Sequence, residues 1–287
     1  MKRARNVKAW LLCAPALAAM ALVTAYPILY AARLSLYRYD LRYAAPPGFT
    51  GLSNYFSVLS SEIWWQALWN TLLITIISVF FELVLGFVLA LLMHKAVFGR
   101  RTVRSAVLVP YAIITVVAAL AWKFAFDPTT GFVNSLLDID QAWLNERWSA
   151  FAVIILSEIW KTTPFMALLL LAGLSLIPND VLKAARVDGA SGIQRFRLVT
   201  LPLMKPSILV ALLFRTLDAF RIFDSVYVLT RGAHGTESVS VIGYNTLIAR
   251  LNLGLGSAVS VLIFLCTLGI ALLFIKGFGT PLLRTGR

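Results

Sequence analysis

The sequence predicts an all-α, polytopic membrane protein with six transmembrane helices. Of its 287 residues, 60% are hydrophobic and 14% are charged, and the mean hydropathy is +0.82. This composition is too apolar for a soluble globular domain. A transmembrane helix needs about 20 predominantly apolar residues. The sequence contains six such stretches, at residues 10–32, 70–93, 104–126, 151–176, 207–229 and 256–275.

The first apolar stretch follows several Lys and Arg residues, so it also has the outline of a cleaved signal peptide. Its apolar run continues through Tyr26, Pro27 and Tyr30, which makes it longer than the roughly 7 to 15 residues of a signal-peptide core. We therefore expect an uncleaved first helix. Cys13 and Cys266 both fall inside predicted helices, without the spacing of a disulfide or a metal site, so they do not indicate a redox compartment.

The net charge of +13 invites a nucleic-acid hypothesis, but the distribution of Lys and Arg indicates a membrane topology instead. Most of these residues lie at the two ends of the chain and in alternate loops, which the positive-inside rule places in the cytoplasm. Both termini and the loop of residues 177–206 are therefore predicted to be cytoplasmic, and we expect no nucleic-acid partner. No long linker divides the sequence, so we expect residues 1–287 to form a single transmembrane domain. The basic residues concerned are Lys2, Arg3, Arg5, Lys8, Lys95, Arg100, Arg101, Arg104, Lys183, Arg186, Arg195, Arg197, Lys205, Lys276, Arg284 and Arg287.

The predicted outer loops differ in composition. Residues 35–66 are rich in Tyr, Phe and Trp, which commonly anchor a protein at the lipid headgroups; contact with an extracytoplasmic partner is the alternative. Residues 127–149 are acidic, with four Asp and Glu residues against a single Arg. The sequence does not indicate which outer loop meets a partner.

The segment of residues 181–206 is a polar, basic insert between two long apolar stretches. Asn179 or Asp180 is predicted to cap a short helix over residues 181–187, because a short polar side chain can accept hydrogen bonds from the first free backbone amides. Gly189 then permits a sharp bend or a close backbone approach.

A second short helix is predicted to begin within residues 191–199. Pro202 and Pro206 mark the return to the membrane, and Pro206 suits the first turn of the fifth transmembrane helix, where its missing N–H costs nothing. The residues alone leave two interpretations of the insert open. It is either a compact cytoplasmic projection or an amphipathic interfacial helix whose Arg side chains lie on lipid headgroups.

Residues of this insert resemble the EAA motif of ABC importer permeases of the maltose/trehalose carbohydrate type, the binding-protein-dependent transport inner-membrane components. The match comprises Lys183, Ala184, Ala185, Asp188, Gly189, Ala190, Phe196, Leu201, Pro202 and Pro206. Lys183 stands where the motif has Glu, so a contact made by that Glu cannot be carried over. Two further segments, SEIWKTTPFMALLLLAGLSLIPND and LLFRTLDAFRIFDSVYVLTRGA, are similar to the trehalose-uptake permeases of this family.

The resemblance implies a type I ABC importer permease fold in the cytoplasmic (inner) membrane, and a transport subunit rather than an enzyme. It also implies a second permease subunit, an ATPase dimer that uses ATP and Mg²⁺, an extracytoplasmic sugar-binding (lipo)protein and a disaccharide substrate such as trehalose. The insert would then couple the permease to the ATPase through Lys183, Ala184, Ala185, Asp188, Gly189 and Ala190.

The sequence lacks the phosphate-binding signature G-x-x-x-x-G-K-[ST], so ATP hydrolysis would have to come from a partner. His94 and His234 are isolated, and no metal-ligand spacing occurs. We therefore expect this chain to bind no metal and no cofactor of its own.

The fifth apolar stretch carries four ionisable residues at intervals of three: Arg215, Asp218, Arg221 and Asp224. Ionisable groups at membrane depth are costly and indicate a functional site. Neighbours of opposite sign can pair along the helix. Because each three-residue step falls about 60° short of a full turn on a continuous helix, we expect Arg215, Asp218 and Ile222 to share one face and Asp224 to point elsewhere.

The fourth apolar stretch combines Glu158 and Lys161, which are spaced to pair, with Thr162 and Phe165. Hydrogen-bonding groups bind sugar hydroxyls and aromatic faces bind the C–H side of the ring, so these residue types suit a sugar site. A structural salt-bridge network between helices is the alternative. The resemblance to the maltose-type permeases implies a substrate pathway lined by Glu158, Lys161, Thr162, Phe165, Arg215, Asp218, Ala219 and Ile222.

Glu82 and Lys123 are two further ionisable residues within apolar stretches, and we expect them to be buried in structural pairs. Two rival functions remain for the chain. An ion- or proton-coupled secondary transporter would explain the intramembrane carboxylates. A membrane-embedded enzyme would need a nucleophile or a metal cluster at membrane depth, and the sequence offers no such constellation.

Overall fold

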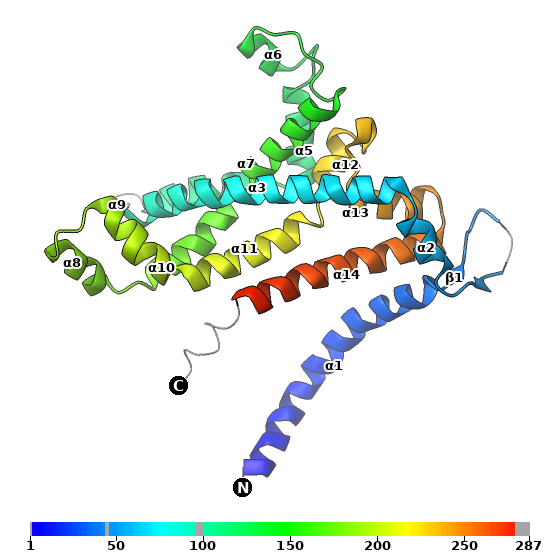
Figure 1. Ribbon diagram of the computed structural model, residues 1–287, viewed down its shortest axis with the longest axis horizontal. Helices are drawn as coiled ribbons and strands as arrows, with labels where there is room; N and C mark the ends of the chain where they lie inside the picture. Colours follow the sequence, from blue (N-terminus) through cyan, green and yellow to red (C-terminus); the bar gives the residue numbers. More distant parts are fainter. Residues whose placement is uncertain (1, 44–45, 96–99, 279–287) are drawn as a thin grey trace. The chain divides into compact units, whose positions relative to one another are not determined.

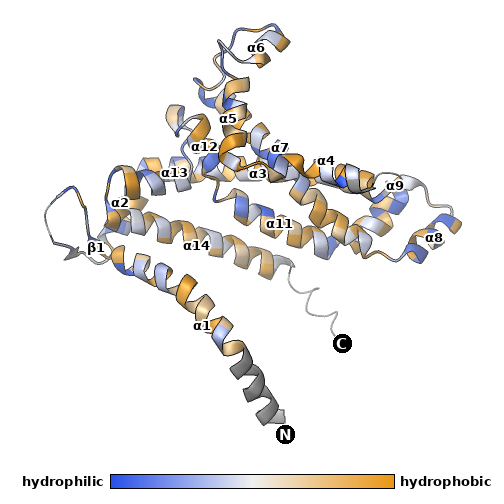
Figure 2. Ribbon diagram, turned by 180° about the vertical axis from the view of Figure 1, so that it is seen from behind, coloured by the Kyte–Doolittle hydropathy of each residue, from blue (hydrophilic) through white to orange (hydrophobic). Residues whose placement is uncertain are grey.

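A computed structural model describes residues 2–43, 46–95 and 100–278 (Figure 1). Four helices in this part of the chain are long and apolar enough to cross a membrane, and two bent pairs bring the total to as many as six spans. Apolar residues predominate along these helices (Figure 2). The predicted all-helical membrane fold is therefore confirmed. The four long helices are α1 Lys2–Leu34, α3 Glu62–Lys95, α7 Arg147–Ser175 and α14 Leu253–Phe278.

The first bent pair consists of α4 Arg100–Ala112 and α5 Thr115–Ala125, which meet at 83°. The prediction of a continuous helix over 104–126 is therefore wrong, because the chain leaves helical geometry at residues 113–114. Pro110 precedes this break. It has no N–H to donate to the preceding turn, and its ring crowds that turn, so it weakens α4 before the break and does not by itself account for the break at residues 113–114.

The second bent pair runs from residue 192 to residue 229, with a bend of 69° at Met204. Pro206 lies in the first turn after the bend, as predicted. The helix predicted over 207–229 is interrupted, however, because residues 220–223 leave helical geometry. The elements of this pair are α9 Gly192–Arg195, the π-helix η1 Phe196–Thr200, α10 Leu201–Leu203, α11 Lys205–Ala219 and α12 Asp224–Leu229.

Shorter elements occupy segments outside the predicted spans. They are too short to cross a membrane, and the hydropathy pattern does not predict them, although the short helix expected over 181–187 corresponds to α8. They are β1 Tyr37–Arg38, β2 Gly48–Phe49, α2 Ser53–Leu59, α6 Phe132–Leu137, α8 Asn179–Val187, the 3-10 turn η2 Ala233–Gly235, α13 Val239–Tyr244 and the π-helix η3 Asn245–Ala249. The two strands pair antiparallel, with Tyr37 opposite Phe49.

The chain divides into two compact units. The first comprises Met1–Trp65 and Ile242–Leu265. In this unit the connection after α1 is tied to the segment before α14 by an isolated antiparallel bridge between Asp40 and Asn252. The apolar window of α1 has none of its residues buried, which suits a helix that faces lipid or another subunit. The single transmembrane domain expected from the sequence stays a prediction.

The second unit comprises Gln66–Val241 and Cys266–Arg287, and its core consists of two apolar clusters along α7. Residues 151–159 of α7 pack with α3, α12 and α13, whereas residues 166–174 pack with α3 and α11. Along α7, the buried polar residues Lys161 and Thr162 lie between these two clusters, and Glu158 lies at the edge of the first. The core therefore places a polar layer at the middle of the helices.

Two glycines let the helices of this unit approach closely. A Cβ atom added to Gly86 of α3 would lie 2.8 Å from Cγ of Met166 in α7. One added to Gly173 of α7 would lie 2.5 Å from Cβ of Ser207 in α11. Small residues at such contacts are typical of membrane helices. They hold α3, α7 and α11 tightly together around the polar layer.

Candidate functional site

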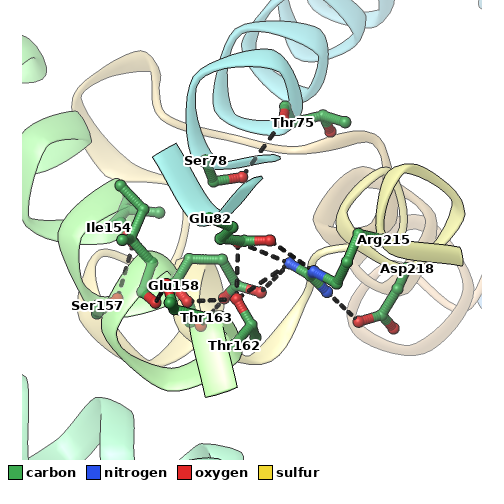
Figure 3. A network of polar contacts seen from close by, with 12 residues as sticks. Thr75, Ser78, Glu82, Ile154, Ser157, Glu158, Thr162, Thr163, Arg215 and Asp218 are labelled. Carbon is green, nitrogen blue, oxygen red and sulfur yellow. Dashed lines mark hydrogen bonds and ion pairs between the residues drawn. The ribbon is translucent and has the colours of Figure 1, made fainter. Parts of the chain in front are cut away.

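Arg215 of α11 lies at the centre of a polar network that joins α3, α7 and α11 (Figure 3). Its Nε lies 2.6 Å from Oε2 of Glu82 and its Nη2 lies 2.9 Å from Oε1 of the same carboxylate. This two-pronged geometry makes Arg–carboxylate pairs strong. Both side chains have 0% exposure, so Glu82 is buried in a pair, as predicted. The hydroxyl of Thr162 lies 2.7 Å from Glu82 and 3.2 Å from Arg215.

Two further carboxylates complete this network, which we call the Arg215 cluster: Glu82, Glu158, Thr162, Arg215 and Asp218. Oε1 of Glu158 lies 3.6 Å from Nη2 of Arg215, and its Oε2 accepts a hydrogen bond of 3.1 Å from Ser225. Asp218 forms an ion pair with Arg215, as their spacing on the helix predicts. The side chain of Asp218 stays 65% exposed, so it is the accessible member of the cluster.

Lys161 does not pair with Glu158 among the described contacts, and the prediction from their spacing is wrong. Its Nζ lies 2.7 Å from the carbonyl oxygen of Ile113 and 3.5 Å from that of Tyr111. These carbonyls lie at the end of α4, where the break frees them from helical bonding and the helix dipole favours a cation. The ring of Tyr111 also stacks on Phe165, with the centroids 5.2 Å apart.

A cavity of about 540 Å³, which we call the central cavity, opens between the α4–α5 break, α7 and the α11–α12 break. Five of the eight predicted pathway residues line it: Glu158, Lys161, Thr162, Asp218 and Ile222. Arg215 and Ala219 are instead buried, with exposures of 0% and 1%. Phe165 stacks on Tyr111, which does line the cavity.

Asp224 lines the same cavity as Asp218, so the prediction that it points elsewhere is wrong. That prediction assumed a continuous helix, whereas α11 ends at Ala219 and α12 begins at Asp224. The hydroxyl of Ser238 donates a hydrogen bond of 2.9 Å to the carbonyl of Ile222 within the break. Non-helical backbone at membrane depth is tolerated where protein groups satisfy it in this way.

The two helix breaks supply cavity residues that the sequence analysis did not assign to the pathway. They are Tyr111, Ile113, Ile114, Thr115, Arg221, Phe223, Asp224 and Ser225. Pro110 lies near the first break and is a general sign of a weakened helix, but it does not fix the position of that break, and no comparable signal marks the second. Lys123, expected to be buried in a pair, is exposed, and its Nζ lies 3.3 Å from the carbonyl oxygen of Val228.

The loop of residues 177–206 projects as a series of short helices that starts with α8 Asn179–Val187. The residue before α8 is Pro178, and no side chain caps the helix. The prediction that Asn179 or Asp180 is the cap is therefore wrong by one or two positions. Asp180 lies in the first turn of α8, where a carboxylate is favoured by the helix dipole.

Gly189 ends α8 with a left-handed backbone, at φ +81°. The amide of Ala190 donates to the carbonyl of Ala185 at 3.0 Å, and the amide of Gly189 donates to that of Arg186 at 3.1 Å. These two bonds are the Schellman motif, which satisfies free carbonyls at a helix end. The predicted bend is confirmed. An added Cβ would meet nothing within 4 Å, so the backbone conformation, rather than packing, favours glycine here.

The helix α9 starts at a capping box. The hydroxyl of Ser191 accepts from the amide of Gln194 at 3.3 Å, and the side chain of Gln194 accepts from the amide of Ser191 at 2.7 Å. Such reciprocal bonds fix a helix start. The predicted second helix is confirmed and continues through η1 and α10 to Leu203. Phe196 packs edge to face against Phe87 of α3, with the centroids 5.7 Å apart, which attaches the projection to the bundle.

The outer surface of this projection is uncovered. The side chain of Lys183 is 74% exposed, and Asp180, 3.5 Å away, is 94% exposed. An ion pair between such exposed groups contributes little. Val187 and Ile193 are 88% and 73% exposed. A surface that combines apolar groups with weakly paired charges is typical of a protein contact.

These features define a class of protein. The described chain has up to six membrane spans. Its second unit holds a charged cavity between two helix breaks and an exposed projection of short helices. Among the described residues, no group of three or more His, Cys, Asp or Glu side chains could hold a metal ion. The arrangement is that of a membrane transport subunit.

The family model described as "Binding-protein-dependent transport system inner membrane component" matches residues 11–278, and the chain belongs to this family. It is 54% identical to the "Trehalose transport system permease protein SugA" of Mycobacterium tuberculosis, over 94% of this chain and 88% of that protein. It is 39% identical to the "Trehalose/maltose transport system permease protein MalF" of Thermococcus litoralis, over 93% of this chain and 92% of the relative. The chain is therefore a membrane transport subunit rather than an enzyme.

A solved structure confirms the fold. The chain matches a chain of a bacterial ABC transporter involved in the import of the acidic polysaccharide alginate, with a TM-score of 0.81. The match covers 96% of this chain and 98% of the other, at 23% identity. The predicted ABC importer permease fold is therefore correct.

Proposed function

We propose that this chain is the permease subunit of an ATP-driven importer for trehalose or a related disaccharide, and that it forms half of the translocation pathway. The observation that carries this proposal is the 54% identity to a trehalose permease over 94% of the chain. The trehalose/maltose permease at 39% identity supports the same class of substrate. The fold alone does not select a sugar, since it also serves an alginate importer.

The central cavity suits a disaccharide. Its volume of about 540 Å³ falls within the roughly 300–1,000 Å³ typical of small-molecule sites. Asp218 can accept hydrogen bonds from sugar hydroxyls, and Arg221 can donate hydrogen bonds to the hydroxyl oxygens. Tyr111 and Phe223 offer aromatic surface for the C–H side of a sugar ring. Of the eight predicted pathway residues, Glu158, Lys161, Thr162, Asp218 and Ile222 also contact sugar in this proposal, and Arg215, Ala219 and Phe165 support them.

The proposed assembly adds a second permease subunit, two ATPase subunits and an extracytoplasmic sugar-binding (lipo)protein. Both termini of this chain lie in the cytoplasm in this arrangement. The ATPase subunits use ATP and Mg²⁺, and this chain holds no cofactor. The exposed Val187 and Ile193 supply apolar area for docking on an ATPase. The remaining coupling contacts come from Lys183, Ala184, Ala185, Asp188, Gly189 and Ala190.

The packing suggests how movement of the projection reaches the cavity. Phe196 packs on Phe87 of α3, and α10 leads into α11 through the bend at Met204. A displacement of the projection therefore acts on α3 and α11 together. Glu82 and Arg215 clamp these two helices to each other. The cavity beside the clamp would open to one side of the membrane and then to the other as the helices move.

The first test is the composition of the native complex. The chain is tagged in its own cell, extracted in mild detergent and analysed by mass spectrometry. We expect an ATPase, a second permease and a sugar-binding protein to co-purify. Recovery of the chain alone, from a preparation that retains other membrane complexes, would argue against the importer.

The second test is uptake by proteoliposomes that contain the purified complex and its binding protein. We expect labelled trehalose to accumulate only when ATP is enclosed with the ATPase subunits, and unlabelled related disaccharides to compete. Uptake that follows a proton gradient and ignores ATP would identify a secondary transporter instead. ATP-dependent uptake of a different sugar would retain the importer and reject trehalose.

A further inference from the structure

A second cavity, of about 590 Å³, lies at the base of the projection. The ends of α3 and α7 form one side, and α8 and α9 form the other. Four basic side chains line it: His94, Lys183, Arg186 and Arg195. No Asp or Glu is found among its described lining residues. We call it the basal cavity. Its charge differs from that of the central cavity, which carries both signs.

Arg195 has hydrogen-bonding capacity left over in the basal cavity. Its Nε is buried and has no partner among the described residues. The capping box at Ser191 fixes the start of the helix that carries it. Lys183 forms an ion pair with Asp180 at 3.5 Å, but both side chains are exposed and the pair is weak. A buried donor without a partner calls for an explanation, and an anion beside these cations would supply one.

The position of the basal cavity indicates which anion it suits. The cavity lies where two membrane-spanning helices end, at Leu91 and His94 of α3 and just beyond α7 at Ile177. We place these helix ends near the lipid phosphates, on the side of the membrane that the charge distribution predicts to be cytoplasmic. Apolar side chains, including Leu91 and Ile177, form part of the wall. A wall with both cations and apolar groups suits an anionic lipid, and basic pockets between such helices are known to bind lipid headgroups.

We propose that the basal cavity binds the phosphate group of an anionic phospholipid, with Arg186 and Arg195 as its principal donors and Lys183 beside them. A free phosphate shares the charge but makes no use of the apolar wall. The bound lipid would brace the projection against α3 and α7. Coupling would then depend on the anionic lipid content of the membrane, independently of which sugar is carried.

The test measures lipid-dependent stabilisation of the purified full-length chain in detergent. Short-chain phosphatidylglycerol, phosphatidylcholine of equal chain length and inorganic phosphate are titrated separately, and Tm is recorded. The Arg186→Gln/Arg195→Gln double variant is compared with Arg197→Gln, which removes a basic residue that does not line the cavity. We expect a saturable rise in Tm with phosphatidylglycerol for the wild type and for Arg197→Gln, and at least a tenfold loss of apparent affinity for the double variant.

Several outcomes would overturn the proposal. They are the absence of saturation in the wild type, an equal loss of affinity in Arg197→Gln, and saturation by inorganic phosphate at the same concentration as the lipid. The titration is repeated with the ATPase bound, and disappearance of the lipid effect there would assign the cavity to the ATPase contact. If the double variant does not fold, the single variant Arg195→Gln is compared with Arg195→Lys. Arg195→Lys keeps the charge and should bind phosphatidylglycerol more tightly than Arg195→Gln.

Discussion

The Arg215 cluster and the exposed projection place their charges in opposite environments. Arg215 and Glu82 have 0% exposure and bind each other through two short contacts within one chain. Lys183 is 74% exposed, and the carboxylate of Asp180 nearby is more exposed still. The first region has its partners inside the chain, whereas the second leaves its surface open to another molecule. The difference separates residues that hold the bundle together from residues that, in the proposed function, contact the rest of the transporter.

The largest effect is expected from breaking the clamp in the Arg215 cluster. Arg215→Met would leave Glu82 and Glu158 buried without their cation, and removal of one partner of a buried pair typically costs about 3–5 kcal/mol. We expect little folded protein, or a large fall in the free energy of unfolding in detergent. Size-exclusion profiles and denaturant unfolding would measure this effect.

The matched control for that change removes both charges of the clamp. Arg215→Met combined with Glu82→Leu should recover at least about 2 kcal/mol, because replacing both members of a buried pair by apolar residues is often close to neutral. A single Arg215→Met variant as stable as the wild type would show that the cluster does not hold the helices together. Its charges would then have to be assigned to transport alone.

The next largest effect is expected at the end of α8, and it should appear in coupling rather than in stability. Gly189→Trp adds bulk to an exposed surface and places a side chain at φ +81°, where L-residues are strained by about 1–2 kcal/mol. We expect the assembled complex to lose sugar-stimulated ATP hydrolysis. The affinity of the binding protein for sugar should not change.

Gly189→Asn is the control, because Asn tolerates a left-handed backbone better than other side chains. It should keep most of the stimulated hydrolysis while carrying a side chain of moderate size. Normal stimulation in Gly189→Trp would contradict the assignment of this projection as the coupling element. Equal losses in both variants would mean that bulk, rather than the backbone conformation, decides the effect.

Asp218 combines features of both regions, because it pairs with buried Arg215 yet its side chain stays 65% exposed. Asp218→Ala should raise the KM for sugar roughly tenfold, as expected for loss of one hydrogen bond to a charged group. The free energy of unfolding should change by less than about 1 kcal/mol, as for an exposed ion pair. Asp140→Ala, in a loop that the sequence predicts to be outer, is the control. A loss of stability without a change in transport would place Asp218 with the framework.

The sequence predicted the spans well because each long apolar run needs only its own composition to be recognised. The bend at Gly189 was also predictable, since a glycine after a short helix is a local signal. Glu82 was expected to pair, but its partner Arg215 is 133 residues away. A single sequence gives no measure of such a distant contact, so the geometry of the clamp could not be derived.

The helix breaks were the main failure, and they account for the errors at the candidate site. A break in a membrane helix is stable only if other groups satisfy the freed carbonyls. Lys161 does this for Ile113, and Ser238 does it for Ile222. These partners come from distant parts of the chain, so local propensity favoured continuous helices. The wrong prediction for the direction of Asp224 follows from the assumption that the helix is continuous.

The smallest effect is expected at Asp127, which lies outside the spans. Like the charges of the Arg215 cluster, its carboxylate has partners within this chain. Its Oδ1 accepts hydrogen bonds from the amides and hydroxyls of Thr130 and Thr129. These bonds, the Thr130 amide first, hold the pKa of the Asp127 carboxyl well below its ordinary value of 3.8. A lowered folded-state pKa means that the contribution to stability is present above that ordinary value and is lost as the pH falls below it.

Asp127→Asn should therefore lower Tm slightly at neutral pH, and the difference from the wild type should shrink below about pH 4 as the wild-type carboxylate takes up protons. Thermal unfolding of both proteins across this pH range would measure the difference. Asp127→Glu keeps the charge but moves it away from the two threonines. If Asp127→Glu matched the wild type at every pH, the hydrogen-bonded turn would contribute nothing beyond its charge, and the parallel with the Arg215 cluster would fail.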